Sequence, residues 1–129
     1  MTPDRASEAI DELRRSLPEG TVRSEQSARL AYSHDATFQR RLPDAVVSPL
    51  TTEDVQLVLR VASDAGIPVV TRGAGSGLSG GAVPLDGGIV LMLAGMDRLL
   101  EIDVANGVAV VEPGVITAGL QDRVEAKGL

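Results

Sequence analysis

Apolar residues recur every three or four positions near the N-terminus, which is the period of an amphipathic helix. The face they form carries Ala6, Ile10, Leu13 and Leu17. Thr2 is placed to cap this helix, and Pro18 followed by Gly20 is placed to end it. A second helix is predicted at Glu25–Ala31, whereas residues 32–42 show no period and indicate a loop.

The pattern then alternates between short apolar runs and a longer helical period. Ala45–Val47 and Val69–Thr71 predict two buried strands. The segment between them predicts a helix that begins after Thr51 or Thr52 and ends at Gly66. Its predicted apolar stripe consists of Val55, Val58, Leu59, Ala62 and Ala65. A strand–helix–strand unit of this kind implies parallel strands with a right-handed crossover.

The C-terminal third changes to an antiparallel pattern. Ile89–Leu93 predicts another strand, and the alternating runs Leu100–Val104 and Val108–Val111 flank Asn106-Gly107, which predicts a hairpin. A last helix is predicted to be capped by Thr117. The sequence therefore predicts an α/β (α+β) fold: a small, mainly parallel sheet with flanking helices, followed by the start of an antiparallel layer.

Composition narrows the classes of function. The 129 residues include 12 Lys and Arg against 18 Asp and Glu, a formal net charge of −6 that argues against a nucleic-acid partner. The chain has no cysteine and a single histidine, His34, so we expect no metal site. No apolar stretch reaches the about 18 residues of a membrane helix, and the N-terminus lacks a signal-peptide core, so we expect a cytoplasmic protein.

Glycines gather directly after the strand predicted at Val69–Thr71. Seven of the 14 glycines lie between Gly73 and Gly88. Turn geometry alone accounts for Gly87 and Gly88. In Gly73–Gly81, which we call the glycine loop, missing side chains let the backbone approach a ligand, and successive N–H groups can face an anion. Because open α/β sheets bind ligands at the carboxyl ends of their strands, the pattern favours phosphate binding over a structural turn.

The loop matches the fingerprint GxGxxG from Gly75 to Gly80, but the helix that should follow it is missing from the pattern. A nicotinamide site is therefore disfavoured, although Asp97 stands at a plausible distance for a ribose-binding acid. A P-loop is excluded because no Lys-Ser or Lys-Thr follows the glycines.

Arg72 offers either a bidentate donor to phosphate or an ion pair within the fold, and the sequence leaves both open. Ser76 and Ser79 add hydroxyl donors to the loop. Several donors of this kind suit a pyrophosphate better than a single phosphate.

Three ordered motifs together resemble a known family. They are PDAVVSPLTTEDVQLVLRVASDAGIPVVTRGAGSGLSGGAVPLDGGIVL, MDRLLEID and VEPGV. They resemble the FAD-binding domain of the vanillyl-alcohol oxidase and p-cresol methylhydroxylase (PCMH) superfamily, in its glycolate oxidase D-subunit and D-lactate dehydrogenase branch. The resemblance covers roughly residues 30–129. It divides the chain into an N-terminal helical segment, 1–42, and the N-terminal part of a PCMH-type FAD-binding domain, 43–129, which we expect to be incomplete.

The resemblance implies non-covalent FAD, since Ser76 stands where some members carry a histidine bonded to the flavin. It implies that the glycine loop binds the FAD pyrophosphate, that Pro49 lies near the adenine end, and that the Pro-Gly of VEPGV approaches the flavin. The implied cofactor-binding residues are Pro49, Arg72, Gly73, Ala74, Gly75, Ser76, Gly77, Leu78, Ser79, Gly80, Gly81, Pro113 and Gly114.

The resemblance further implies a flavoprotein oxidoreductase that oxidises a 2-hydroxy acid such as glycolate or D-lactate and passes electrons to a quinone, a cytochrome or another acceptor. Relatives are several times longer, so we expect this chain to be a fragment that is inactive alone. Its expected partners are FAD and the missing downstream half or another subunit, with peripheral membrane association of the parent complex. No general base is evident, because the adjacent His34 and Asp35 diverge. The alternative is a non-catalytic nucleotide-binding or assembly module.

Ile89–Leu93 and Val108–Val111 are both nearly continuous in apolar residues, which is typical of strands covered on both faces. Without a downstream half, we expect an open apolar face or edge, self-association that grows with concentration, and weak binding of FAD.

Overall fold

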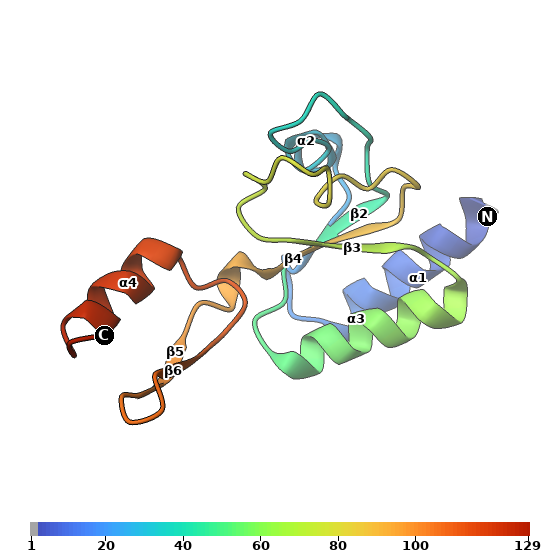
Figure 1. Cartoon of the computed structure of the whole chain (residues 1–129). Coiled ribbons are helices and arrows are strands. Elements are labelled where there is room, and N and C mark those ends of the chain that lie inside the picture. The colour runs from blue at the N-terminus through green and yellow to red at the C-terminus, as the bar shows by residue number, and fades with distance from the viewer. Residues whose placement is uncertain (1–2) are drawn as a thin grey trace.

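The computed structural model describes the backbone of residues 3–129 and the side chains from Arg5 onward. A four-stranded sheet with the order β1-β2-β4-β3 is followed by a two-stranded sheet, β5-β6 (Figure 1). The elements in chain order are α1 (Pro3–Ser16), β1 (Val22–Arg23), α2 (Gln26–Ala31), β2 (Ala45–Val47), α3 (Thr52–Ala65), β3 (Val69–Arg72), β4 (Ile89–Met92), the 3₁₀ helix η1 (Leu93–Gly95), β5 (Leu99–Asp103), β6 (Val108–Val111) and α4 (Thr117–Glu125).

The larger sheet confirms the predicted α/β class. Strand β4 lies between β2 and β3 and runs parallel to both, with Val90 opposite Val46 on one side and Val70 on the other. The short strand β1 pairs antiparallel with β2 and was not predicted, because two residues carry no measurable period. The hairpin predicted around Asn106-Gly107 is also confirmed, since β5 and β6 pair antiparallel.

Helices α1 and α3 lie side by side along one face of the larger sheet (Figure 1). Their buried side chains and those of the strands form the core, which includes Ala6, Ala9, Leu13, Leu17, Val47, Val58, Val61, Ala62, Ile67, Ile89 and Leu91. The predicted stripe of α3 was wrong at Leu59, which is 46% exposed, whereas Val61 is buried. Leu59 stands about 100° around the helix from Val58, at the margin of the buried face.

Two predicted helix starts have different outcomes. Thr51 caps α3 as predicted: its hydroxyl accepts from the Asp54 amide, and the Asp54 carboxylate accepts from the Thr51 amide. The cap predicted at Thr117 was wrong, because Ile116 holds the extended N-cap conformation and Thr117 is the first helical residue of α4. The cap predicted at Thr2 lies outside the described residues.

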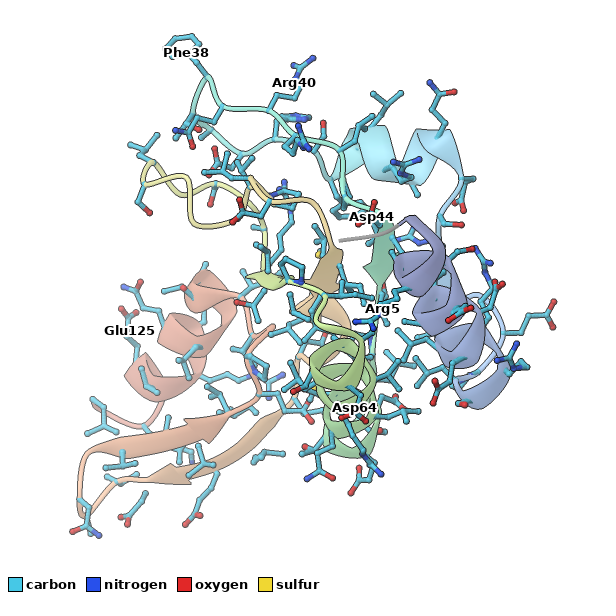
Figure 2. All side chains as sticks on the ribbon, turned by 90° about the vertical axis from the view of Figure 1, so that its right-hand side faces the viewer. Arg5, Phe38, Arg40, Asp44, Asp64 and Glu125 are labelled. Carbon is cyan, nitrogen blue, oxygen red and sulfur yellow. The ribbon has the colours of Figure 1, made fainter. Side chains whose placement is uncertain are left out.

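The hairpin and α4 extend to one side of the larger sheet, and both views show them beside it and not on its face (Figures 1 and 2). No residue of α4 is buried. Within residues 3–129, no helix has the length and apolar character needed to cross a membrane.

Candidate functional site

A cleft of about 500 Å³ lies between the start of the glycine loop and the start of α4. Gly73 and Ala74 line it from one side, and Pro113 and Gly114 from the other. Its further lining residues are Ala94, Asp97, Val115, Ile116, Thr117 and Ala118. The volume falls within the range of small-molecule sites, about 300–1,000 Å³. The structure thus brings together four predicted site residues that are far apart in the sequence.

The parallel strands place the cleft. Arg72 at the end of β3 lies opposite Met92 at the end of β4, so the residues that follow these strands emerge at the same edge of the sheet. Pro49 follows β2 at this edge, where it is fully buried and its carbonyl faces Gly95. It is not among the residues that line the cleft.

Glycines in the loop lack side chains for two different structural reasons. A Cβ atom added at Gly73 or Gly77 would meet no atom within 4 Å, and neither backbone has a positive φ, so the space above them is open. Gly75 has a φ of +70°, and its added Cβ would lie less than 3.0 Å from the Arg72 guanidinium. Gly73 and Gly77 therefore leave room for a ligand, whereas Gly75 leaves room for a side chain of the protein itself.

The remainder of the loop is mostly accessible. Ser76, Leu78, Ser79 and Gly81 are exposed, and the Leu78 side chain is 81% exposed. Gly80 is buried, and its φ is +77°. The serine hydroxyls predicted to donate to phosphate are therefore free to reach a ligand.

Arg72 is used within the fold. The residue is 8% exposed, and one guanidinium nitrogen donates to the carbonyl oxygen of His34 at 2.5 Å. The guanidinium carbon lies 5.5 Å from the centre of the Tyr32 ring, a cation–π distance. These contacts lie within the protein, but they are a hydrogen bond to a carbonyl and a cation–π contact and not the ion pair that the sequence left open.

Asp35 lies beside this arginine and is buried. Its carboxylate accepts from the Thr37 hydroxyl at 2.6 Å and from the Thr37 amide at 2.8 Å. These two bonds lower the pKa of Asp35 against the opposing effect of desolvation, and the charge of Arg72 lowers it further. Asp35 is therefore held as a carboxylate next to the buried guanidinium.

Glu112 begins the Glu-Pro-Gly turn at the cleft, and the sequence analysis missed its role. Its buried carboxylate accepts from the Arg98 guanidinium at 2.6 and 3.0 Å and from the Arg98 amide at 2.8 Å. The bonds from Arg98 lower the pKa of Glu112, and those to Glu112 raise that of Arg98. The predicted hairpin was the sequence signal for this contact. Its strands pair Leu99 with Val111, so the residues next to them, Arg98 and Glu112, also lie opposite each other.

Gly114 joins this turn to η1. Its amide donates to the Met96 carbonyl at 2.7 Å, and an added Cβ would lie less than 3.0 Å from the carbonyl oxygens of Leu93 and Met96. This close packing directs the start of α4, Thr117 and Ala118, into the cleft. The first N–H groups of a helix have no partner within the helix and favour an anion. The sequence signal for this wall was the helix predicted to begin near Thr117, shortly after the Pro113-Gly114 turn.

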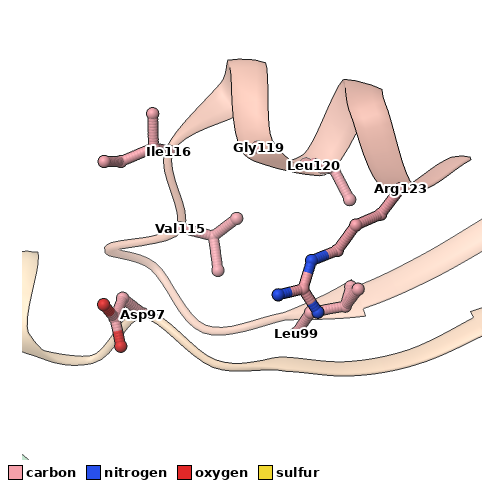
Figure 3. A pocket seen from close by; sticks show the side chains of 7 residues that line it. All are labelled: Asp97, Leu99, Val115, Ile116, Gly119, Leu120 and Arg123. Carbon is pink, nitrogen blue, oxygen red and sulfur yellow. The ribbon is translucent and has the colours of Figure 1, made fainter.

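An adjoining hollow of about 260 Å³ lies between the hairpin and α4 (Figure 3). Asp97 lines both spaces, and the Arg123 guanidinium points into the hollow towards Leu99. No helix follows the glycine loop, so Asp97 is not the acid of a nicotinamide fingerprint. Among the side chains described from Arg5 onward, no three histidine or acidic residues are placed to hold a metal ion.

Comparisons with known proteins found a matching family, similar sequences and similar structures. The family described as "FAD binding domain" matches residues 43–129. The glycolate oxidase subunit GlcD of Bacillus subtilis is 45% identical over 104 residues, which cover 80% of this chain and 22% of that protein. The D-lactate dehydrogenase of Archaeoglobus fulgidus is 42% identical over 104 residues, covering 77% of this chain and 23% of that protein.

Among solved structures, p-cresol methylhydroxylase with substrate bound superposes with a TM-score of 0.84 at 27% sequence identity. The match covers 100% of this chain and 26% of that one. The chain therefore spans about a quarter or less of the length of the proteins it matches.

Proposed function

The chain belongs to the FAD-binding domain family, the cofactor of which is FAD, and on this premise we propose that the cleft binds the FAD pyrophosphate without a covalent bond. The observation that carries the proposal is the meeting of Gly73 and Ala74 with Pro113 and Gly114 around one cleft of about 500 Å³. These residues come from two motifs that the sequence analysis assigned to the same cofactor.

The residues present fit a pyrophosphate. Open space above Gly73 and Gly77 lets backbone N–H groups come close to phosphate oxygens. The start of α4 contributes further unpaired N–H groups at the positive end of its dipole. When bound, FAD supplies the acceptor for hydride, and the role of these residues is to bind and orient it. Ser76, in place of a histidine, supports non-covalent binding, and we propose that Pro49 lies towards the adenine end.

We further propose that the reaction served is the oxidation of a 2-hydroxy acid. The names of two relatives, a glycolate oxidase subunit and a D-lactate dehydrogenase, support this substrate class. No residue of the chain is assigned to bind the acid or to take its proton. Further polypeptide of the same protein, or another subunit, is the proposed source of those groups, and the exposed side chains of β6 support such a partner. The cytoplasmic location stays a prediction.

The decisive experiment adds a side chain at a position where the protein leaves open space, so that the side chain blocks the ligand without disturbing the fold. Gly73→Val, at a residue that lines the cleft, should weaken FAD binding at least tenfold in a flavin fluorescence titration while leaving the unfolding transition unchanged. Gly119→Val, where an added Cβ also meets no atom within 4 Å, is the matched control, because Gly119 lines the adjoining hollow and not the cleft. Gly75→Val is the poorer test, since it would also displace Arg72. Undiminished FAD affinity in Gly73→Val would refute the site.

An activity assay tests the proposal that the groups acting on the 2-hydroxy acid come from outside this chain. Hydride transfer needs a substrate held against the flavin and a base within reach. We therefore expect the 129-residue chain with FAD to show no oxidation of D-lactate or glycolate with a dye acceptor. FAD-dependent turnover would show that the chain carries catalytic groups that we have not assigned.

A further inference from the structure

Residues 33–41, which we call the covering segment, lie beside the glycine loop in both overall views (Figures 1 and 2). The two touch at two separate points. The carbonyl of His34 accepts from Arg72 at the base of the glycine loop, and the side-chain oxygen of Gln39 lies 2.8 Å from where a Cβ of Gly80 would stand. The covering segment also closes on itself, with the Arg41 amide donating to the Ser33 carbonyl at 2.8 Å.

Arg72 occupies the junction of these two segments. A buried guanidinium is costly unless it is paired and hydrogen-bonded. Here it has the His34 carbonyl, the face of Tyr32 and the neighbouring charge of Asp35. One carboxylate oxygen of Asp35 is buried with no hydrogen-bond partner among the described residues. All of these partners lie in the covering segment or directly before it.

The glycine loop is shaped around the same guanidinium. Gly75 turns through a φ of +70° directly against it, at a distance that no side chain at position 75 could share. Arg72 itself is not among the residues that line the cleft. The guanidinium therefore supports the loop from within the protein.

Resting on the proposed function, we propose that Arg72 is a positioning residue: it ties the covering segment to the glycine loop and thereby sets the loop backbone that receives FAD. The guanidinium does not itself bind the pyrophosphate. On this account Gly75 is a glycine because Arg72 lies beneath it, and the open positions Gly73 and Gly77 face the ligand.

Hydrogen exchange of the chain without FAD tests whether Arg72 holds the covering segment against the glycine loop. Arg72→Met should speed exchange at the Arg41 and Thr37 amides at least tenfold, while the Leu91 amide in β4 stays protected. Arg23→Met is the matched control, because Arg23 also lies over the Tyr32 ring, at 5.4 Å, but donates to the hydroxyls of Tyr32 and Ser48 and not to the covering segment. Unchanged exchange in Arg72→Met would overturn the proposal.

Conservative variants supply a second readout. Tyr32→Phe keeps the ring face and should preserve both exchange and FAD affinity, whereas Tyr32→Leu should impair both. Arg72→Lys keeps the charge but loses the planar group, and it should bind FAD as weakly as Arg72→Met, at least tenfold below wild type. If Arg72→Lys restored FAD affinity while the covering segment still exchanged rapidly, the side chain would be a direct phosphate donor, and the proposal would be wrong.

A double-mutant cycle tests the explanation of Gly75. Gly75→Ala should speed loop exchange strongly in the wild-type background and several-fold less in Arg72→Ala, because the clash is then absent. Equal effects in both backgrounds would contradict it. Failure of the wild-type chain to bind FAD at any concentration would overturn the proposed function alone, since the exchange results decide the tie between the segments.

Discussion

Strands β4 and β6 are both short apolar runs, yet they lie in opposite environments. Ile89, Val90 and Leu91 of β4 are at most 1% exposed, whereas Val108 and Val110 of β6 are 50% and 44% exposed. Strand β4 has a parallel neighbour on each side and belongs to the sheet packed against α1 and α3. Among the described residues, β6 pairs with β5 alone. An apolar run therefore indicates a strand that is stable when buried, but it does not show whether other elements of the chain bury it.

The two regions are held by different forces. In the sheet body, residues 3–92, the buried apolar cluster dominates. In the hairpin region, residues 96–129, polar contacts predominate, chiefly the bonds between Glu112 and Arg98 and the bond from Gly114 to Met96. The cleft lies where these regions meet, so its shape depends on a well-packed wall and on a wall that a few hydrogen bonds hold in place.

The largest contrast should come from equal truncations in the two regions. Leu91→Ala removes a side chain that is 1% exposed and should lower the free energy of unfolding by about 2–5 kcal/mol. Leu100→Ala removes one that is 56% exposed and should cost about 0.5 kcal/mol or less. Urea denaturation measures both. Similar losses would mean that the hairpin is covered in solution and that the contrast between the regions is not real.

A smaller effect is expected where the regions join. Gly114→Ala places a Cβ against the carbonyls of Leu93 and Met96, so the turn must move away from η1. We expect a loss of about 1–3 kcal/mol and faster amide exchange at Gly114, with β4 unaffected. Gly119→Ala, in open space on α4, should leave exchange at Gly114 unchanged. Unaltered exchange in Gly114→Ala would show that the contact with η1 does not hold the turn.

Acidification should loosen the hairpin region in particular. Because Arg98 depresses the pKa of Glu112 in the folded protein, the stabilisation by Glu112 is complete above the ordinary glutamate pKa of about 4.3. It is lost as the pH falls through the depressed value. The exchange-derived protection of the Arg98 amide, corrected for intrinsic rate, should therefore fall in acid. Glu112→Gln should remove this pH dependence, whereas Glu101→Gln, exposed on β5, should retain it.

The smallest effect concerns the exposed valines. Free apolar edges recruit other chains, so light scattering should show association of the chain that grows with concentration. Val108→Thr with Val110→Thr keeps the branched shape, removes part of the apolar surface, and should reduce that association. The control is Val104→Thr, because Val104 is also exposed but lies outside β6, at the hairpin loop. A monomer at every concentration would refute this reading of β6.

Local chemistry in the sequence predicted much of this molecule. The capping residues Thr51 and Asp54, the Asn106-Gly107 turn and the cluster of loop glycines each act over a few residues, so their patterns are visible without a fold. The position of β4 between β2 and β3 could not be predicted in that way, because strand order depends on contacts between distant segments. Arg72 shows the same limit, since its partner is a backbone carbonyl, which any residue at position 34 would supply.

The most direct test of the central claim is a map of amide chemical shifts during titration of the chain with FAD, carried to millimolar concentration so that weak binding is detected. We expect shifts at Gly73 and Ala74 and at Gly114–Ala118, the two walls of the cleft, with none around Asp64 at the end of α3. A second hollow, lined in part by Arg29 and Arg40, lies apart from the cleft. Shifts confined to that hollow, or no shifts at either wall of the cleft at millimolar FAD, would contradict the proposed site.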